Sequence, residues 1–207
     1  VYDGNGNDYV EGNAGSDIIF SEDGNNWVHG GAGNDTISGN DGNETIYGGS
    51  GEDVISGNAG SDLIDAGTND DVVLGGQGND SITGGSGQDA LHGEEHNDFI
   101  DGGSDNDLIT GGQGQDKLIG NSGDDYIDGG SDNDQLFGDA GHDALFGGKG
   151  SDVMVGGSGN DLLDGGAGFD AYIGGSGADQ FVFNQLTDST IHAMDMIDDF
   201  NQGEDQI

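Results

Sequence analysis

The chain has 207 residues, of which 47 are glycine and none is proline or cysteine, and its formal net charge is −40. Valine, isoleucine, leucine and phenylalanine make up about a fifth of the chain, near the limit below which a highly charged chain stays disordered. This composition excludes a conventional hydrophobic core. The charge opposes binding to nucleic acid or to an anionic membrane surface, and no apolar run approaches the roughly 18 residues of a membrane span. The expected partners are cations.

A nine-residue repeat runs without insertion from residue 3 to residue 182, in twenty copies. Residues 75–83 are a typical copy, Gly-Gly-Gln-Gly-Asn-Asp-Ser-Ile-Thr. Position one is glycine in 17 copies, position two in 13 and position four in 16, and position eight is apolar in all twenty. The other residues at position four are Asn69, His96, Asp105 and Asp132, types that tolerate positive φ. Position four is therefore predicted to be left-handed.

Each repeat predicts a turn followed by a short strand. Its first six residues are rich in Gly, Asn, Asp and Ser, which favour turns, and its last three place one apolar side chain between two outward ones. We therefore expect a six-residue turn and a three-residue strand, such as Thr36-Ile37-Ser38.

The tandem pattern Gly-Gly-x-Gly-x-Asp-x-apolar-x resembles the RTX (repeats-in-toxin) calcium-binding nonapeptide family over 180 of the 207 residues. The resemblance implies an all-β fold for residues 3–182, a right-handed parallel β-roll of about ten coils of 18 residues. Equivalent positions 18 residues apart would then stack on one another. It also implies calcium as the bound ion.

Stacking would arrange the position-six residues in two columns, one along each edge of the roll. We call the first column Asp8, Asn26, Glu44, Asp62, Asp80, Asp98, Asp116, Asp134, Asp152 and Asp170, and the second column Asp17, Asp35, Asp53, Asp71, Asp89, Asp107, Asp125, Asp143, Asp161 and Asp179. All of them except Asn26 are candidate metal ligands. Carboxylates stacked so closely would repel one another unless divalent cations lay between them, and calcium accepts carboxylate and carbonyl oxygens. Ten residues in each column leave nine gaps between consecutive residues, so the two columns could hold up to about 18 ions. We expect folding and calcium binding to be one event.

Two substitutions weaken the first column near its N-terminal end. Asn26 and Glu44 stand where the other eighteen repeats carry aspartate. The three gaps that these two residues border are therefore expected to bind calcium weakly or not at all.

The period ends after Val182, and residues 183–207 form a different segment. Its pattern Asp195-x-Ile197-x-Asp199-Phe200-x-x-Gly203-x-Asp205-x-Ile207 is similar to the segment that closes many RTX blocks. The resemblance implies a partial cap over the last coil, with the family's C-terminal secretion signal not visible in this sequence.

An apolar stripe interrupts the polar outer surface. Position nine carries Ile119, Phe137, Val155 and Ile173 at intervals of 18 residues. Either the residues after Phe183 fold back over this stripe, or it is a docking face for a neighbouring domain or subunit.

The leading hypothesis is a non-catalytic module of a secreted bacterial RTX protein, exported by type I secretion and folded by calcium outside the cell or at its surface. The parent could be an adhesin, a toxin, a surface-layer component or an exoenzyme. One alternative is part of a carbohydrate-active β-helix enzyme, but a chain without arginine lacks the means to hold an anionic sugar. Another is an ice-binding adhesin module, although position three is threonine only at Thr68.

Overall fold

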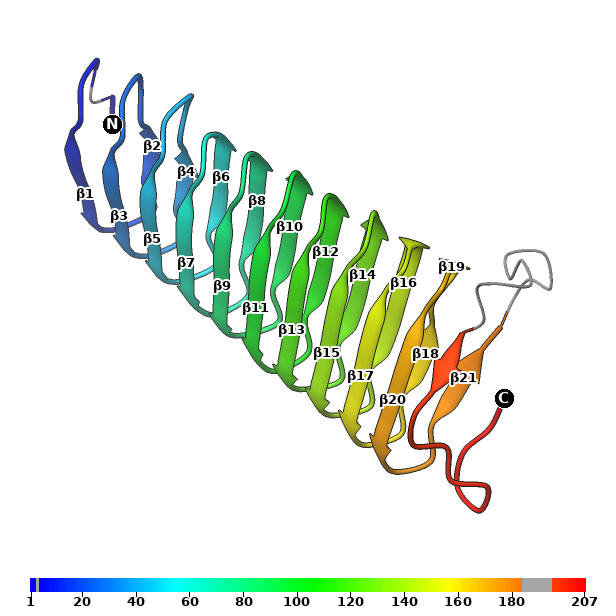
Figure 1. Cartoon of the computed structure of the whole chain (residues 1–207). Helices are drawn as coiled ribbons and strands as arrows, with labels where there is room; N and C mark the ends of the chain where they lie inside the picture. The colour runs from blue at the N-terminus through cyan, green and yellow to red at the C-terminus, as the bar shows by residue number, and fades with distance from the viewer. Residues whose placement is uncertain (3, 184–194) are drawn as a thin grey trace.

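The protein is an all-β parallel solenoid built from two facing sheets (Figure 1). The structure is a computed structural model that describes residues 1–2, 4–183 and 195–207. Within these residues no helix is long and apolar enough to cross a membrane. The fold class predicted from the repeat, a β-solenoid of about ten coils of 18 residues, is confirmed.

Odd-numbered strands form most of the first sheet and even-numbered strands most of the second. The first sheet contains β1 (Tyr9–Ala14), β3 (Trp27–Ala32), β5 (Thr45–Ser50), β7 (Leu63–Thr68), β9 (Ser81–Ser86), β11 (Phe99–Ser104), β13 (Lys117–Ser122), β15 (Gln135–Ala140), β17 (Val153–Ser158), β20 (Ala171–Ser176) and β22 (Met196–Ile197). The second contains β2 (Ile18–Phe20), β4 (Thr36–Ser38), β6 (Val54–Ala59), β8 (Val72–Gln77), β10 (Ala90–Glu95), β12 (Leu108–Gln113), β14 (Tyr126–Ser131), β16 (Ala144–Gly150), β18 (Leu162–Asp164) and β21 (Gln180–Val182), with β19 (Ala167–Gly168) also paired to β16.

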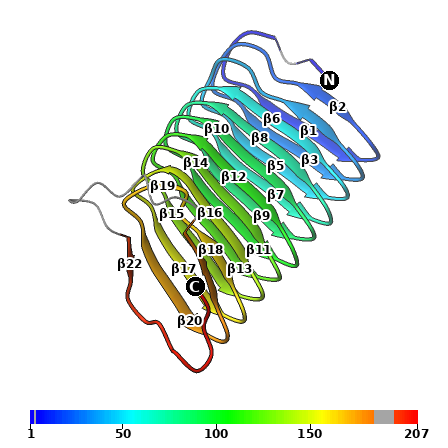
Figure 2. The same ribbon diagram turned by 90° about the vertical axis from the view of Figure 1, so that its right-hand side faces the viewer.

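Every coil repeats the register of the coil before it. Val10 lies opposite Val28, and Val28 opposite Ile46, so residues 18 positions apart are neighbours in the sheet. Figure 2 shows the successive coils stacked along one axis. The predicted strand length was wrong, because most strands have six residues and include positions one to three of the next repeat. Those glycine-rich positions also pair with their neighbours, for example Gly31 with Gly49.

The core consists mainly of the position-eight side chains, which both sheets direct into the space between them. All twenty, from Val10 to Phe181, are at most 5% exposed. The alternation of a strand points position eight inward and positions seven and nine outward. Two such side chains per coil bury little apolar surface for 18 ordered residues, so other interactions must hold the coils together.

The turns depend on left-handed residues at two positions of the repeat. Position four has positive φ in every repeat except at Gly42, and its non-glycine residues include His96 at 80° and Asp105 at 77°. The prediction for position four is thus confirmed. Position two is left-handed as well, except at Glu22 and Asn40, and this was not predicted.

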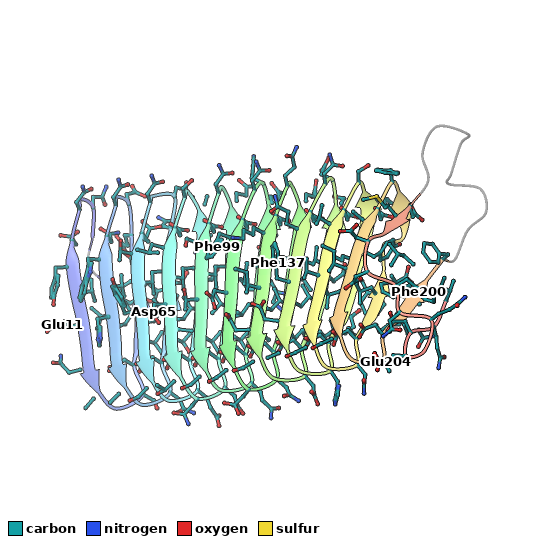
Figure 3. The ribbon with its side chains drawn as sticks, turned by 60° about the horizontal axis from the view of Figure 1, so that its bottom comes forward. Glu11, Asp65, Phe99, Phe137, Phe200 and Glu204 are labelled. Atoms are coloured by element: carbon teal, nitrogen blue, oxygen red, sulfur yellow. The ribbon has the colours of Figure 1, made fainter. Side chains whose placement is uncertain are left out.

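The described C-terminal residues extend the solenoid beyond the last repeat. Strand β22 pairs in parallel with β20, and Ile197 packs against the core. The ring of Phe200 lies 6.2 Å from that of Phe181, at the C-terminal end of the rod (Figure 3). Residues 195–207 therefore lie at the end of the coil stack. Residues 184–194, which also belong to the segment predicted to fold back over the apolar stripe, lie outside the described residues.

Candidate metal centre

The position-six side chains point into the turns at the two edges of the solenoid. The position-six residue is the last turn residue before a strand. Asp35, for example, directly precedes β4, and Asp53 directly precedes β6. All predicted ligands from Asp35 to Asp179 are at most 3% exposed, and only Asp8 and Asp17 at the N-terminal end are half-buried. The structure therefore places the predicted ligands in two buried columns of carboxylates.

One carboxylate oxygen of each position-six aspartate from Asp35 to Asp179 accepts a hydrogen bond from the preceding coil. The backbone N–H of Asp35 donates to Oδ1 of Asp53 at 2.7 Å, and the N–H of Asp53 donates to Oδ1 of Asp71 at 2.7 Å. The contact continues along both columns, at 2.8 Å from Asp80 to Asp98. These bonds fix the orientation of each carboxylate through the backbone alone.

The second oxygen of the same carboxylates has no partner. Among the described residues, Oδ2 of Asp35, of Asp53 and of most other position-six aspartates is buried without a hydrogen bond. An unpaired charged oxygen is costly to bury. A row of such oxygens is the arrangement expected of ligands for a cation.

Position one, which is glycine in 17 of the twenty repeats, provides the space beside most of these oxygens. A methyl group on Gly30 would lie 2.5 Å from Oδ2 of Asp35 and 2.6 Å from the carbonyl oxygen of Gly48 in the next coil. Position one is therefore kept small where a carboxylate oxygen and a main-chain carbonyl oxygen converge. Both are hard oxygen donors of the kind that calcium binds, so the residues fit the predicted ion.

Within the metal-free fold the columns favour protonated carboxyl groups. Burial, with a smaller contribution from neighbouring carboxylates of the same column, raises the pKa of Asp98 and Asp134 to about 8. Burial likewise raises the pKa of Asp71 and Asp107 to about 7. A bound cation would reverse this effect by stabilising the charged form.

The first column is irregular where the sequence departs from aspartate. The Oδ1 atom of Asn26 still accepts the backbone N–H of Asp8 at 2.9 Å, but its amide nitrogen donates to the carbonyl of Glu22. Both carboxylate oxygens of Glu44 are buried without a partner, and burial and Asp62 raise its pKa to about 8. The longer side chain also crowds the turn, because a methyl group on Gly42 would clash with it.

No group of three or more His, Cys, Asp or Glu side chains placed to hold one metal ion is found in the part of the chain that the structure describes. Each candidate centre instead combines stacked position-six carboxylates with main-chain oxygens.

A second ladder of hydrogen bonds, which was not predicted, runs beside the columns. The Oδ1 atom of Asn79 accepts the backbone N–H of Asn97 at 3.1 Å, and Oδ1 of Asn97 accepts that of Gln115 at 2.8 Å. These position-five side chains bond to the following coil, whereas position-six carboxylates bond to the preceding one. The frequency of Asn, Asp and Ser at position five was the available signal.

The apolar stripe is continuous on the outer face of the first sheet. Ile119 lies opposite Phe137, Phe137 opposite Val155 and Val155 opposite Ile173. All four are partly exposed. The ammonium of Lys117 lies between two rings at its edge, 5.4 Å from the centre of Phe99 and 5.6 Å from that of Phe137.

Comparison with protein families supports the interpretation of the repeat as calcium-binding. A family model described as the RTX calcium-binding nonapeptide repeat matches five consecutive segments, residues 2–37, 38–73, 74–109, 110–145 and 146–181. No curated protein sequence matches the chain. Among solved structures, the chain is similar to a hyperactive, Ca²⁺-dependent, β-helical antifreeze protein from an Antarctic bacterium. The identity is 20%, the match covers 87% of this chain and 86% of that one, and the TM-score is 0.38.

Proposed function

Because the chain belongs to the RTX calcium-binding nonapeptide repeat family, we propose that calcium ions bind along both position-six columns and that this binding drives folding. The observation that carries the proposal is the row of buried Oδ2 atoms without partners. The solenoid of residues 3–182 is the calcium-binding domain, and residues 183–207 are its partial C-terminal cap.

The chain's own residues prepare each site. The backbone N–H of one coil fixes Oδ1 of the next position-six residue, as between Asp35 and Asp53, and Oδ2 of Asp53 lies beside Gly48, near the carbonyl oxygen of Ala66 in the next coil. Calcium supplies positive charge that compensates the buried carboxylates and links consecutive coils. Up to about 18 ions would carry +36 and bring the formal charge from −40 close to zero.

The proposed role is non-catalytic, in a secreted bacterial protein that is exported by type I secretion. With a net charge of −40 the chain would remain unfolded where calcium is scarce. Extracellular calcium modules bind with Kd of about 10⁻⁴ to 10⁻³ M, so the module would fold outside the cell or at its surface.

The apolar stripe is proposed to contact a neighbouring domain or subunit of the parent protein. Its four side chains form one continuous surface on β13, β15, β17 and β20, on a molecule whose other surfaces are rich in carboxylates. A contiguous apolar surface that is partly exposed to solvent is typical of an interaction site.

Far-ultraviolet circular dichroism in a chelator and then in millimolar calcium tests the proposed function. We expect a largely disordered chain in chelator and β-structure after calcium addition. Magnesium is the control and should fold the chain poorly, because these turns do not impose its octahedral geometry. A compact, fully β-structured chain in the chelator would contradict calcium-driven folding.

A further inference from the structure

Two aspartates of the C-terminal segment repeat the geometry of position six without its nine-residue spacing. The backbone N–H of Asp170 donates to Oδ1 of Asp195 at 3.1 Å, and that of Asp179 donates to Oδ1 of Asp205 at 3.1 Å. The residues that follow them pair like position seven, because Met196 lies opposite Ala171 and Gln206 opposite Gln180. Asp195 thus extends the first column and Asp205 the second.

The ends of the two columns differ in what fills the space beside the last repeat aspartate. Earlier in the solenoid, the space beside the position-one glycine and the Oδ2 atom holds a carbonyl oxygen of the next coil. At the end of the first column, a methyl group on Gly165 would lie 2.5 Å from Oδ2 of Asp170 and would also touch the hydroxyl of Tyr172. At the end of the second, a methyl group on Gly174 would lie 2.9 Å from a ring carbon of Phe181. Beside the last repeat aspartate, the first column therefore has the hydroxyl oxygen of Tyr172, whereas the second has the aromatic ring of Phe181.

The hydrogen bonds of the two ends differ in the same way. Asp170 is fully buried, and its Oδ2 has no partner among the described residues. The Tyr172 hydroxyl accepts the N–H of Gly165 at 3.1 Å. Asp205, in contrast, uses its second oxygen to accept the N–H of Asn201 at 2.7 Å. Only the first end retains a buried carboxylate oxygen without a partner.

We propose that Asp170, Tyr172 and Asp195 form an additional calcium site at the end of the first column, and that Asp205 has no equivalent site. Two carboxylates and a neutral hydroxyl are hard oxygen donors suited to calcium, whereas the ring of Phe181 offers none. The ion ties β22 to the last repeat. This inference rests on the proposed function, because it presupposes that the position-six carboxylates bind calcium.

Counting bound calcium by native mass spectrometry on the full chain tests the site. Asp195→Asn keeps an oxygen that can accept the N–H of Asp170 but removes the charge, and we expect one ion fewer than in the unchanged chain. Asp205→Asn is the matched control and should lose none. In Tyr172→Phe, a higher calcium concentration should be needed to fill the site between Asp170 and Asp195. The same ion count in Asp195→Asn and the unchanged chain, or an equal loss in Asp205→Asn, would overturn the proposal.

The outcome separates this inference from the proposed function. If the unchanged chain binds no calcium, the proposed function fails as well. If it binds calcium and folds but Asp195→Asn retains every ion, only the terminal site is wrong. Should Asp195→Asn fail to fold, a calcium-grown crystal of the unchanged chain decides. An ion within about 2.3 to 2.6 Å of both Asp170 and Asp195 supports the site, and its absence refutes it.

Discussion

The backbone N–H of Asp35 donates a hydrogen bond of 2.7 Å to Oδ1 of Asp53, one coil further along the solenoid. The same carboxylate leaves Oδ2 buried without a partner, beside the glycine of position one. Each position-six aspartate therefore has two tasks, since one oxygen binds the preceding coil and the other faces the space proposed for calcium.

Asp53→Ala removes both tasks at a position in the uninterrupted second column. We expect the loss of the two ions that Asp53 contacts and a cost of about 3 to 5 kcal/mol in the calcium-bound state, because neighbouring carboxylates lose their compensation. Calcium titration followed by circular dichroism measures the change. Glu52→Ala is the matched control, since it removes an exposed carboxylate one residue away and should shift the midpoint little. Equal midpoints for the two variants would argue against Asp53 as a ligand.

Asn26→Asp should strengthen the interrupted first column. The new carboxylate would lie between Asp8 and Glu44 and provide the missing charged oxygen, so the calcium midpoint should fall. Asn25→Asp adds the same charge at an exposed position outside the column and should not lower it. If the calcium concentration at the midpoint fell in Asn25→Asp but not in Asn26→Asp, position in the column would not determine the calcium affinity.

Acidification should stabilise the metal-free fold. Burial raises the folded-state pKa to about 6 at Asp80 and about 8 at Asp98, above the ordinary value of about 4. The stabilisation by such protonated groups is fully present below about pH 4 and is lost as the pH rises through 6 to 8. In calcium-free buffer, circular dichroism should therefore show more β-structure at about pH 5 than at about pH 8.

Calcium competes with these protons for the same carboxylates, so occupying the sites of the folded chain should require more calcium at the lower pH. A metal-free chain that loses β-structure on acidification would contradict the burial of these carboxylates.

Much of the fold follows from the repeat, because its positions have separate physical tasks. The apolar residue at position eight and the positive-φ residue types at position four were sufficient to predict the core and one left-handed turn residue. The left-handed position two was missed, although Asn58, Asn121 and Asp139 replace glycine there and signalled it. Strand length was wrong because glycine-rich segments seldom form strands, yet stacking against identical neighbours pairs them here.

The C-terminal segment could be predicted only in part. Asp195 and Asp205 belong to a recognisable pattern, but their alignment with Asp170 and Asp179 breaks the nine-residue period and appears only in the hydrogen bonds. Likewise, the hydroxyl of Tyr172 reaches the space beside Asp170 because of three-dimensional packing, and a position-eight residue gives no sign of it.

Removing residues 184–207 should impair folding more than removing residues 1–29. The first deletion exposes the apolar ends at Tyr172 and Phe181, because it removes Ile197, which lies opposite Tyr172, and Phe200, which contacts Phe181. The second removes coils that already carry the weakened site at Asn26. The calcium midpoint of folding should rise more in the C-terminal truncation. Equal midpoints for the two truncations would count against a capping role.

The most direct test of the central claim is an anomalous difference map from crystals grown with calcium. The account predicts ions along the whole second column, within about 2.3 to 2.6 Å of Oδ2 atoms such as that of Asp53, and vacant or water-filled gaps beside Asn26 and Glu44 in the first. Equal occupancy of both columns, with ions beside Asn26 as strong as those beside Asp53, would contradict it. The backbone carbonyls, and not the position-six carboxylates, would then determine calcium affinity.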